Sequence, residues 1–472
     1  MRRLAALILF STSCWAVCTT HTYTVGTGKD YPGATGVADA IAAVKAACGY
    51  EVYFGGTQTI SVYAAGGPYS AIPGDTYTLY STATYPLIIT AAPGESPVFN
   101  CGGSTAPLIE LDSNYATFNG FEITACGGIY SGAPVTNVTI SNNYIHDTVG
   151  SYWAINPNGS QTNWWVHHNR IVNVAGGGIG VQGNALIEYN EVGPTTAGAL
   201  TQITCGNAGV SCTIRNNIAY GIGPTSNIMV NFLQYYAATV SGNVSYYNGV
   251  GFDASTTGSS SNLATFSHNI AAYSAHYVTN CEGGGGACWT NTDHALILKD
   301  EGSSGLSSVE YDSVSSVAST LSLTSSILWG DSTISPNTHL ISVAALNSLY
   351  SDYNVFNKTG SFNTAQDTSG PTYYATLAAW QATGRDTHTV QTDPRFVGSI
   401  SLLSTASQVF PECPTIECRL AKIRHNYTPT NLALKGTGCA WNGTTCVPDH
   451  SDIGPVPVTV YDAPGITGGG VY

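Results

Sequence analysis

Charged side chains are scarce in this sequence of 472 residues. Lys, Arg, Asp and Glu make up 9% of it, whereas an ordinary soluble domain has about 25%. Helices that face water depend on such side chains, so their scarcity favours β structure, with solubility supplied by Ser, Thr, Asn and the 53 Gly. Basic residues are fewest: 14 Lys and Arg against 28 Asp and Glu give a net charge of −14. This balance argues against a nucleic-acid partner, because binding phosphate needs a basic surface.

Several catalytic and metal-binding motifs are also missing. The sequence has no G-x-S-x-G, no H-E-x-x-H and no C-x-x-C, which disfavours a nucleophile-elbow hydrolase, a zincin and a zinc ribbon. One G-x-G-x-x-G run occurs at residues 178–183, but the segment after it, ALIEYN, has a strand pattern. A dinucleotide site needs a helix at that point.

The only long apolar run lies at the N-terminus. Arg2 and Arg3 precede an apolar stretch that extends from Leu4 to Val17. This stretch is too short to span a bilayer and has the order of a secretory signal. We therefore expect a signal peptide at residues 1–16, no membrane span, and a secreted protein that is extracellular or periplasmic.

Cysteine usage agrees with export. Cleavage after Ala16 leaves 12 of the 13 cysteines, an even number that suits disulfides in an oxidising compartment. The spacing predicts six pairs: Cys18–Cys48, Cys101–Cys126, Cys205–Cys212, Cys281–Cys288, Cys413–Cys418 and Cys439–Cys446.

A short motif with asparagine inside an alternating strand pattern recurs along the chain. Examples are VTISNNYI, WVHHNRIV, TIRNNIA and TFSHNIA, and Asn217, Asn243 and Asn269 are spaced 26 and 26 residues apart. This period is too short for a βαβ unit of roughly 30 or more residues. It suits a parallel β-helix, in which each strand pairs with its equivalent one coil along, about 4.8 Å away. Asparagine would stack at equivalent corners, where the chain bends between two strands.

The predicted fold class is therefore all-β: a single-stranded right-handed parallel β-helix, or solenoid. Residues 39–47 read as a short helix that caps the first coil, since open β edges invite aggregation. The segment TYYATLAAWQATG reads as a second helix. The expected domains are the signal peptide at 1–16, the β-helix with its N-terminal cap at 17–398, and an irregular, disulfide-bonded C-terminal cap at 399–472.

Four segments resemble landmarks of secreted right-handed β-helix proteins, the pectate-lyase-like superfamily. They are YTVGTGKDYPGATGVADAI, IITAAPGESPVF, LAAWQATGRDTHTVQTDPRFVG and SDIGPVPV. The resemblance implies this fold for nearly the whole mature chain and a polysaccharide as substrate. The superfamily contains lyases, hydrolases, epimerases and non-catalytic binders, so the reaction has to be argued from a site.

An outward row on the second strand of each coil is the candidate site. It consists of Gln182, Gln202, Asn231, Asp253 and Lys299. The 46 residues from Asp253 to Lys299 equal one coil of 26 plus an insertion of 20, which predicts that these two side chains are neighbours on one face.

Lys299 is the predicted catalytic base. Breaking a uronic-acid polymer by β-elimination needs a base for the C5 proton and positive charge near the carboxylate. Ca²⁺ could supply that charge, because it prefers oxygen ligands. Its predicted ligands are Asp253, Asp293, Asp300 and Glu301. Without the metal, Asp253 and Lys299 would form a surface ion pair worth about 0–1 kcal/mol.

Aromatic and histidine side chains form further candidate clusters. Gln202, Asn231, Trp164, Trp165 and His294 are the predicted substrate-binding residues, with an indole as the platform for a sugar ring. One cluster combines these indoles with His146, Asp147, Tyr152, Trp153, His167 and His168, and another contains His268, His276, Asp293 and His294. The alternative for both is aromatic packing between coils with solvated histidines.

Three functions remain open on the sequence. The first is a polysaccharide lyase acting on an acidic glycan, with Lys299 and Asp253 at the centre. The second is a glycoside hydrolase that uses a carboxylate pair, such as Asp253 with Asp300 or Glu301. The third is a non-catalytic glycan-binding or adhesion protein, which the scarcity of charge favours. The negative net charge opposes a polyuronate substrate unless calcium is bound.

Overall fold

The computed structural model describes most of the chain after the predicted signal peptide. The described residues are 18–48, 55–72, 79, 81–150, 153–157, 162–194, 201–206, 211–221, 230–234, 238–254, 263–280, 289–299, 307–311, 320–330, 339–343, 349–358, 363–367, 370, 372–398, 412–441, 446–449 and 451–454. The predicted signal peptide therefore lies outside the described residues.

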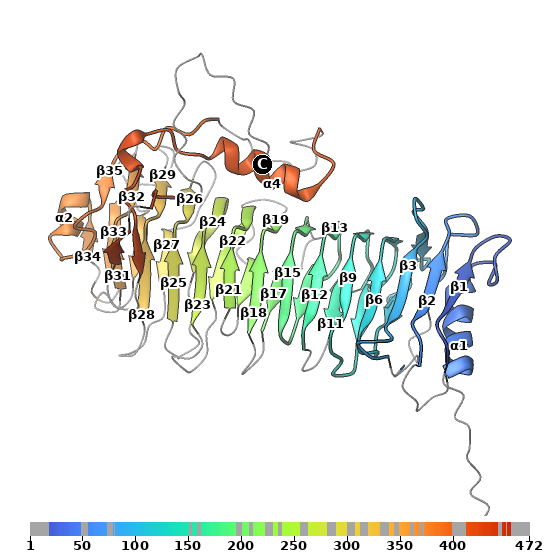
Figure 1. The fold of residues 1–472 in the computed structure, drawn as a ribbon. Coiled ribbons are helices and arrows are strands. Elements are labelled where there is room, and N and C mark those ends of the chain that lie inside the picture. The colour runs from blue at the N-terminus through green and yellow to red at the C-terminus, as the bar shows by residue number, and fades with distance from the viewer. Residues whose placement is uncertain are drawn as a thin grey trace, which may run out of the picture.

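Two long sheets of parallel strands form an elongated coil (Figure 1), which confirms the predicted all-β parallel β-helix. One sheet has 13 strands and the other has 22, and within the larger sheet strands alternate between two positions of the coil. Each full coil thus contributes three strands, which we call A, B1 and B2 in chain order.

The A strands make up the 13-stranded sheet. They are β1 (His21–Val25), β2 (Gln58–Val62), β3 (Leu87–Ala91), β6 (Ala116–Asn119), β9 (Thr139–Ser141), β12 (Trp164–His167), β15 (Ala185–Glu188), β18 (Cys212–Arg215), β21 (Ala238–Ser241), β23 (Ala264–Ser267), β25 (Trp289–Asp293), β28 (Thr320–Thr324) and β31 (Leu349–Asp352).

The B1 strands follow the A strands around a tight corner. They are β4 (Val98–Asn100), β7 (Glu122–Thr124), β10 (Tyr144–His146), β13 (Arg170–Val172), β16 (Glu191–Val192), β19 (Ile218–Tyr220), the first halves of β22 (Val244–Ala254) and β24 (Ile270–Asn280), β26 (Leu296–Lys299), β29 (Ile327–Gly330), β32 (Val355–Lys358) and β35 (Val390–Gln391).

The B2 strands complete the coil. They are β5 (Ile109–Glu110), β8 (Ile129–Ser131), β11 (Ile155–Pro157), β14 (Ile179–Val181), β17 (Thr201–Cys205), β20 (Val230–Gln234), the second halves of β22 and β24, β27 (Ser307–Tyr311), β30 (His339–Val343) and β33 (Asn363–Asp367). The short strand β34 (Thr372–Tyr374) pairs antiparallel with β33.

Buried asparagines form a ladder at the corner between A and B1, as the repeat predicted. The members are Asn143, Asn169, Asn190, Asn217, Asn243 and Asn269, and all are 2% exposed or less. Each Oδ1 from Asn169 onward accepts from both the backbone N–H and the side-chain amide of the preceding member, at 2.9–3.2 Å. The residue before each member has positive φ, for example 55° at Asn142 and 57° at Asn216. The chain therefore bends there while the amide replaces the missing strand partner.

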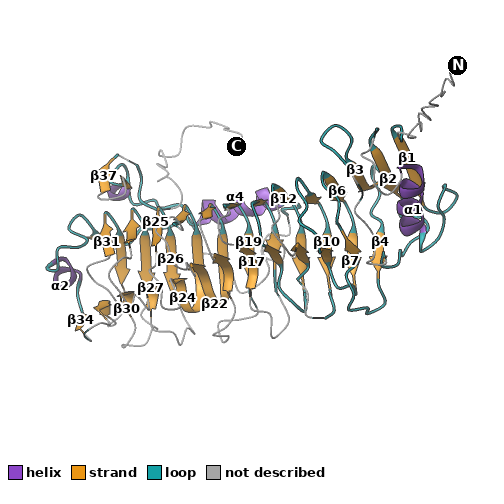
Figure 2. Ribbon diagram, turned by 90° about the horizontal axis from the view of Figure 1, so that it is seen from below, coloured by secondary structure: helices purple, strands orange, loops and turns teal. Residues whose placement is uncertain are grey.

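The two ends of the coil are covered by different helices (Figures 1 and 2). Helix α1 (Gly36–Cys48) covers the first coil with Val37, Ile41 and Val44 buried, which confirms the predicted N-terminal cap. At the other end the second predicted helix is only α2 (Leu377–Gln381), because the preceding TYY forms β34. Its Trp380 is fully buried and donates from Nε1 to Asp386 Oδ2 at 2.6 Å.

The prediction of an irregular C-terminal cap is wrong in one main respect. Residues 412–454, which we call the C-terminal strap, contain helix α4 (Ile416–Asn426), the short helix η2 (Leu432–Leu434) and the hairpin β36 (Cys439–Trp441) and β37 (Cys446–Pro448). Helix α4 begins at Thr415, whose hydroxyl accepts from the N–H of Cys418 at 3.3 Å. It lies alongside the coil and covers no end of it (Figures 1 and 2).

The strap packs on an apolar stripe along the outer side of the B1 strands. In the strands that it covers, the first outward residue after the corner is aliphatic: Ile218, Val244, Ile270, Leu296, Ile327 and Val355. These side chains are buried with Ile416, Leu420 and Ile423 of α4 in a cluster separate from the coil interior. Burying such a stripe supplies the hydrophobic drive that holds the strap to the coil.

Polar contacts position the strap on this stripe. Arg419 of α4 pairs with Glu191. Arg424 donates to Asn216 Oδ1 at 2.7 Å and to the carbonyl of Gly242 at 2.6 Å. A Cβ on Gly242 would lie 2.9 Å from the Arg424 guanidinium, and the φ of Gly242 is +64°, so this position needs glycine for two reasons.

Five of the six predicted disulfides are confirmed. They are Cys18–Cys48, Cys101–Cys126, Cys205–Cys212, Cys413–Cys418 and Cys439–Cys446. Cys281 and Cys288 lie outside the described residues. Among the helices that the structure describes, none is long and apolar enough to cross a membrane.

Candidate functional site

A file of outward positions runs along the B2 strands from one end of the coil to the other. We call it the B2 row. Its members in register order are Glu110, Tyr130, Asn156, Gly180, Thr204, Leu233, Asp253, Asn280, Glu310, Ser342 and Gln366.

Alternation along the strands places this row outside the coil. The residues just before it are apolar and belong to the interior core, as Ile109, Ile129, Ile155 and Ile179 show. Successive side chains of a strand point to opposite faces, so the row lies on the outer face of the coil. Acids, amides and hydroxyls thus recur at the spacing of one coil, about 4.8 Å.

Trp153 lies against this row on a floor of glycine. A Cβ on Gly180, a row member, would lie 2.9 Å from the indole, and one on Gly177 would overlap the ring. The glycine-rich run at 176–180 therefore makes room for an aromatic ring on the outer face. The indole is half-buried, so it is held in place while part of it remains accessible.

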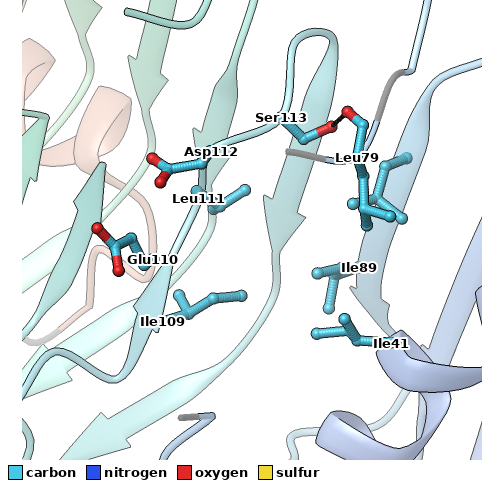
Figure 3. Close-up of a pocket in the computed structure, with 9 residues that line it drawn as sticks. Ile41, Leu79, Ile89, Ile109, Glu110, Leu111, Asp112 and Ser113 are labelled. Atoms are coloured by element: carbon cyan, nitrogen blue, oxygen red, sulfur yellow. Dashed lines mark hydrogen bonds between the residues drawn. The ribbon is translucent and has the colours of Figure 1, made fainter. Parts of the chain in front are cut away.

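The N-terminal end of the row separates carboxylates from the core (Figure 3). Ile41, Leu79, Ile89 and Ile109 line a cavity of about 20 Å³, room for about one water. The Glu110 carboxylate points away from these apolar side chains. This cavity is too small for a ligand, which leaves the outer face as the candidate site.

Asp112 at this end has a structural role. Its Oδ1 accepts from Ser131 Oγ and from the backbone N–H groups of Gly132 and Ala133, at 2.9–3.1 Å. These bonds hold the end of β8 against the neighbouring coil. The carboxylate is thereby engaged with backbone, and Glu110 is the acid of this region that belongs to the row.

The predicted register of Asp253 and Lys299 is wrong. Asp253 belongs to the B2 row and pairs with Leu233 on one side and Asn280 on the other. Lys299 ends the B1 strand β26 and pairs with Gly330. The two residues therefore belong to different files of the coil. Their side chains lie outside the described part of the structure, as does the side chain of Asn231.

The error has a specific cause at the ladder corner. Counting 26 residues from Asn269 leads to Ala295, so this coil has alanine where its neighbours have asparagine. The strand after Ala295 is thus a B1 strand, and the extra residues at 281–288 lie between the B2 part of β24 and β25. On β22 the position in line with Lys299 precedes Asp253 by six residues, about 20 Å of extended strand.

The predicted calcium cluster is not brought together either. Asp293 ends the A strand β25, in the other sheet from Asp253, where its Oδ1 accepts from Thr324 Oγ1 at 2.9 Å. Asp300 and Glu301 lie outside the described residues. Within the described part of the chain no group of three potential metal ligands was found.

Three predicted substrate-binding side chains are enclosed by protein. Trp164 is 1% exposed and donates from Nε1 to the carbonyl of Val135 at 3.2 Å. Gln202 is also 1% exposed, so its predicted outward position is wrong. His294 is buried beneath the strap, where its Nε2 lies 2.9 Å from Ser451 Oγ.

Trp165 and the neighbouring histidines come together on the A face. The Trp165 indole is 43% exposed, and the His167 ring lies 4.0 Å from it. His167 Nδ1 and His168 Nδ1 are 2.8 Å apart, and His168 Nε2 lies 2.5 Å from Glu417 Oε1 of the strap. Trp165 thus belongs to a face different from the one that carries Asp253.

The other members of the two predicted clusters are separate. On B1, His146 lies between Glu122 and Asp147, with contacts of 3.2 and 2.7 Å. The ring of His268 stacks on that of His294 at 5.0 Å, beside Asp293, as predicted. Tyr152 and the side chain of His276 lie outside the described part of the structure.

The A-face histidines predict an acid-sensitive stability. Burial lowers the pKa of His167 to about 4, with His168 adding to the effect and Glu188 opposing it. Between pH 6.5 and 4 the unfolded chain gains a proton that the folded protein does not, so the free energy of unfolding should fall as the pH drops through this window. We expect His167→Gln to reduce the difference between urea unfolding at pH 7 and pH 5.

His268 also has a lowered pKa, caused by burial and then by His294, so part of the pH dependence should survive in the His167 variant. The exposed His425 on α4 provides a matched control. His425→Gln should leave the dependence unchanged, and equal slopes for the wild type and His167→Gln would contradict the assignment.

Comparison with known proteins adds a likeness of architecture. No family model and no curated protein matches the chain. A solved structure described as "Crystal structure of pectate lyase Pel9A" is similar, with 13% sequence identity and a TM-score of 0.45. The similarity covers 94% of this chain and 98% of that chain. At this level the likeness concerns overall shape and assigns no activity.

Sequence reasoning missed most of the B2 row, because its strands are only two or three residues long at the N-terminal end. Glu110, Tyr130 and Asn156 each follow an isoleucine of the core. The signal that could have found them is this recurring isoleucine and polar pair at intervals of 20 to 26 residues. The row offers hydrogen-bonding groups, carboxylates and an indole along one line.

Proposed function

We propose that the protein is carbohydrate-active and binds a polysaccharide lengthwise along the B2 row. The observation that carries this proposal is the row itself, in which Trp153 lies on Gly180 beside acids, amides and hydroxyls. A polysaccharide is a linear repeating ligand, and its successive sugars need recurring hydrogen-bonding groups and an aromatic platform. The disulfides suit an extracellular location, which agrees with the signal peptide expected at residues 1–16.

For the reaction we propose β-elimination of an acidic, uronate-containing glycan, with Lys299 as the base for the C5 proton. Lys299 ends β26, where the chain leaves B1 for the B2 strand that carries Glu310. Asp253 and Glu310 flank Asn280 in the row and would hold Ca²⁺ there, because hard cations prefer carboxylate oxygen. The ion would neutralise the uronate carboxylate.

Hydrolysis is the second candidate, and the register favours it specifically. Asp253 and Glu310 lie two rungs apart in the B2 row, about 9.6 Å at the usual strand spacing. Inverting glycosidases hold their two carboxylates about 6.5–9.5 Å apart. In this reaction one acid would protonate the leaving oxygen and the other would activate water.

Product analysis on a panel of polyuronates and neutral glycans tests these proposals. Elimination yields unsaturated uronates that absorb in the ultraviolet and need Ca²⁺, whereas hydrolysis yields reducing ends without that absorbance. We expect Lys299→Ala to lower the elimination rate about 100-fold or more. The exposed Lys435 supplies the control, and Lys435→Ala should retain full activity.

Two outcomes would overturn the assignment. Unchanged elimination by Lys299→Ala would remove Lys299 as the base, and reducing ends lost in Glu310→Gln would select hydrolysis. Binding to the row is tested separately with Trp153→Ala, which should weaken substrate binding. If wild type binds glycans without cleaving any, the protein is a non-catalytic binder, and both proposed reactions fail.

A further inference from the structure

The A face carries a second outward file that is free of charge. We call it the Trp165 row. Trp165 pairs with Thr139 on one side and Leu186 on the other, and the file continues through threonines on neighbouring coils. These threonines are Thr117, Thr139, Thr213, Thr239 and Thr265. Apart from its indole and one leucine, this part of the file offers only hydroxyl groups at one-coil spacing.

A shallow open groove crosses this file at Trp165. It is lined by Trp165 and Leu186 together with Asn163, Asn184 and Ser211. Amides and a hydroxyl thus surround an exposed indole. This is the combination that sugar rings require, because their C–H faces stack on aromatic rings and their hydroxyls exchange hydrogen bonds with amides.

Hydrogen bonds fix the indole in its exposed position. Trp165 Nε1 donates to Glu188 Oε1 at 2.9 Å, and Arg215 Nε donates to Glu188 Oε2 at 2.6 Å. The His167 ring supports the indole at 4.0 Å. A platform held in this way loses little conformational freedom when a ligand stacks on it. The pairing of Glu188 with Arg215 also leaves the groove without an uncompensated charge.

Charge distinguishes this face from the B2 row. The B2 row contains Glu110, Asp253 and Glu310, whereas the Trp165 row from Thr117 to Ser322 contains no ionisable side chain. The protein as a whole carries a net charge of −14, which repels polyanions. A neutral glycan fits this face, because its stacking and hydrogen bonding need no countercharge.

We propose that the A face is a second, non-catalytic binding site for a neutral polysaccharide, which lies along the coil axis with one sugar ring stacked on Trp165. The file direction sets the orientation, since the threonines continue the line of the groove from coil to coil. The site is separate from the B2 row and does not depend on the reaction proposed there. It would hold the protein on a neutral glycan that accompanies the substrate.

Affinity electrophoresis of the full chain in gels containing a neutral β-glucan, a neutral mannan or a polyuronate tests this proposal. We expect retardation by at least one neutral glycan, and about a tenfold or greater loss of affinity in Trp165→Ala. Trp165→Phe should recover part of the affinity by restoring a ring. Trp153→Ala is the matched control, because it removes an aromatic ring from the other face and should leave neutral-glycan retardation unchanged.

Specific outcomes would overturn the site. These are retardation by the polyuronate alone, by none of the glycans, or by the neutral glycans equally for wild type and Trp165→Ala. Urea unfolding of each variant shows whether it is folded, and a Trp165→Phe variant that binds no better than a folded Trp165→Ala would exclude stacking. Loss of cleavage in a row variant with intact retardation would affect only the proposed reaction.

Discussion

Replacing Asn217 by alanine should lower the free energy of unfolding by about 3–5 kcal/mol, because it leaves several buried polar groups without partners, each costing about 1–3 kcal/mol. Asn217 is fully buried. Its Oδ1 accepts from the backbone N–H and the amide of Asn190 at 2.9 and 3.0 Å. Its amide donates to the carbonyl of Ile187 at 2.9 Å and to Asn243. No water can reach these groups once the side chain is removed.

Urea unfolding followed by circular dichroism measures the effect. Asn142→Gly is the matched control, because Asn142 precedes a ladder member, is exposed, and has a φ of 55° that glycine tolerates. It loses a hydrogen bond to Asn119 and should cost about 1 kcal/mol or less. Similar losses in the two variants would show that the ladder contributes no more than a surface contact.

The ladder also explains how much of the fold was predictable. An asparagine inside an alternating strand pattern marks the corner in the sequence, and its spacing gives the coil length. Where another residue fills the corner, the mark disappears. Ser326 does the same work as asparagine by accepting from the N–H of Ala295 at 3.0 Å. Because serine and alanine are common residues, these coils could not be counted from sequence, and the register of Lys299 was lost with them.

The position of the strap could not be predicted either. Its helix docks on an aliphatic stripe whose members, such as Val244 and Ile270, read equally well as strand residues of the core. Both faces of these strands are apolar, so alternation carries no signal of which one is covered. The exposed indole of Trp165 was predictable from composition, but its separation from Asp253 depends on which side of the coil each strand occupies.

Glu191 is the one acid beneath the part of the strap where neighbouring coils have aliphatic side chains. It is fully buried, and Arg419 of α4, 6% exposed, pairs with it. Arg419 also donates to the carbonyls of Cys413 and Pro414, each at 3.1 Å. The pair therefore fixes where the first turn of α4 sits, since an aliphatic stripe alone would allow the helix to slide along it.

Breaking this pair should be costly. Arg419→Leu leaves a buried carboxylate without its partner, and we expect a loss of about 3–5 kcal/mol in the free energy of unfolding, together with faster hydrogen exchange of the α4 amides. Lys422→Ala removes only an exposed contact with Glu412 at 3.7 Å and should cost about 0–1 kcal/mol, so it serves as the control.

The double variant Arg419→Leu with Glu191→Ile separates charge from packing. It continues the aliphatic stripe of the neighbouring coils, as Ile218 does at the next rung. Replacing a buried ion pair by apolar residues of similar size is often neutral or stabilising, so the double variant should regain most of the stability that Arg419→Leu loses. If it is no more stable than the single variant, the loss comes from the contacts of Arg419 with the backbone of the strap, and the buried charge is not its cause.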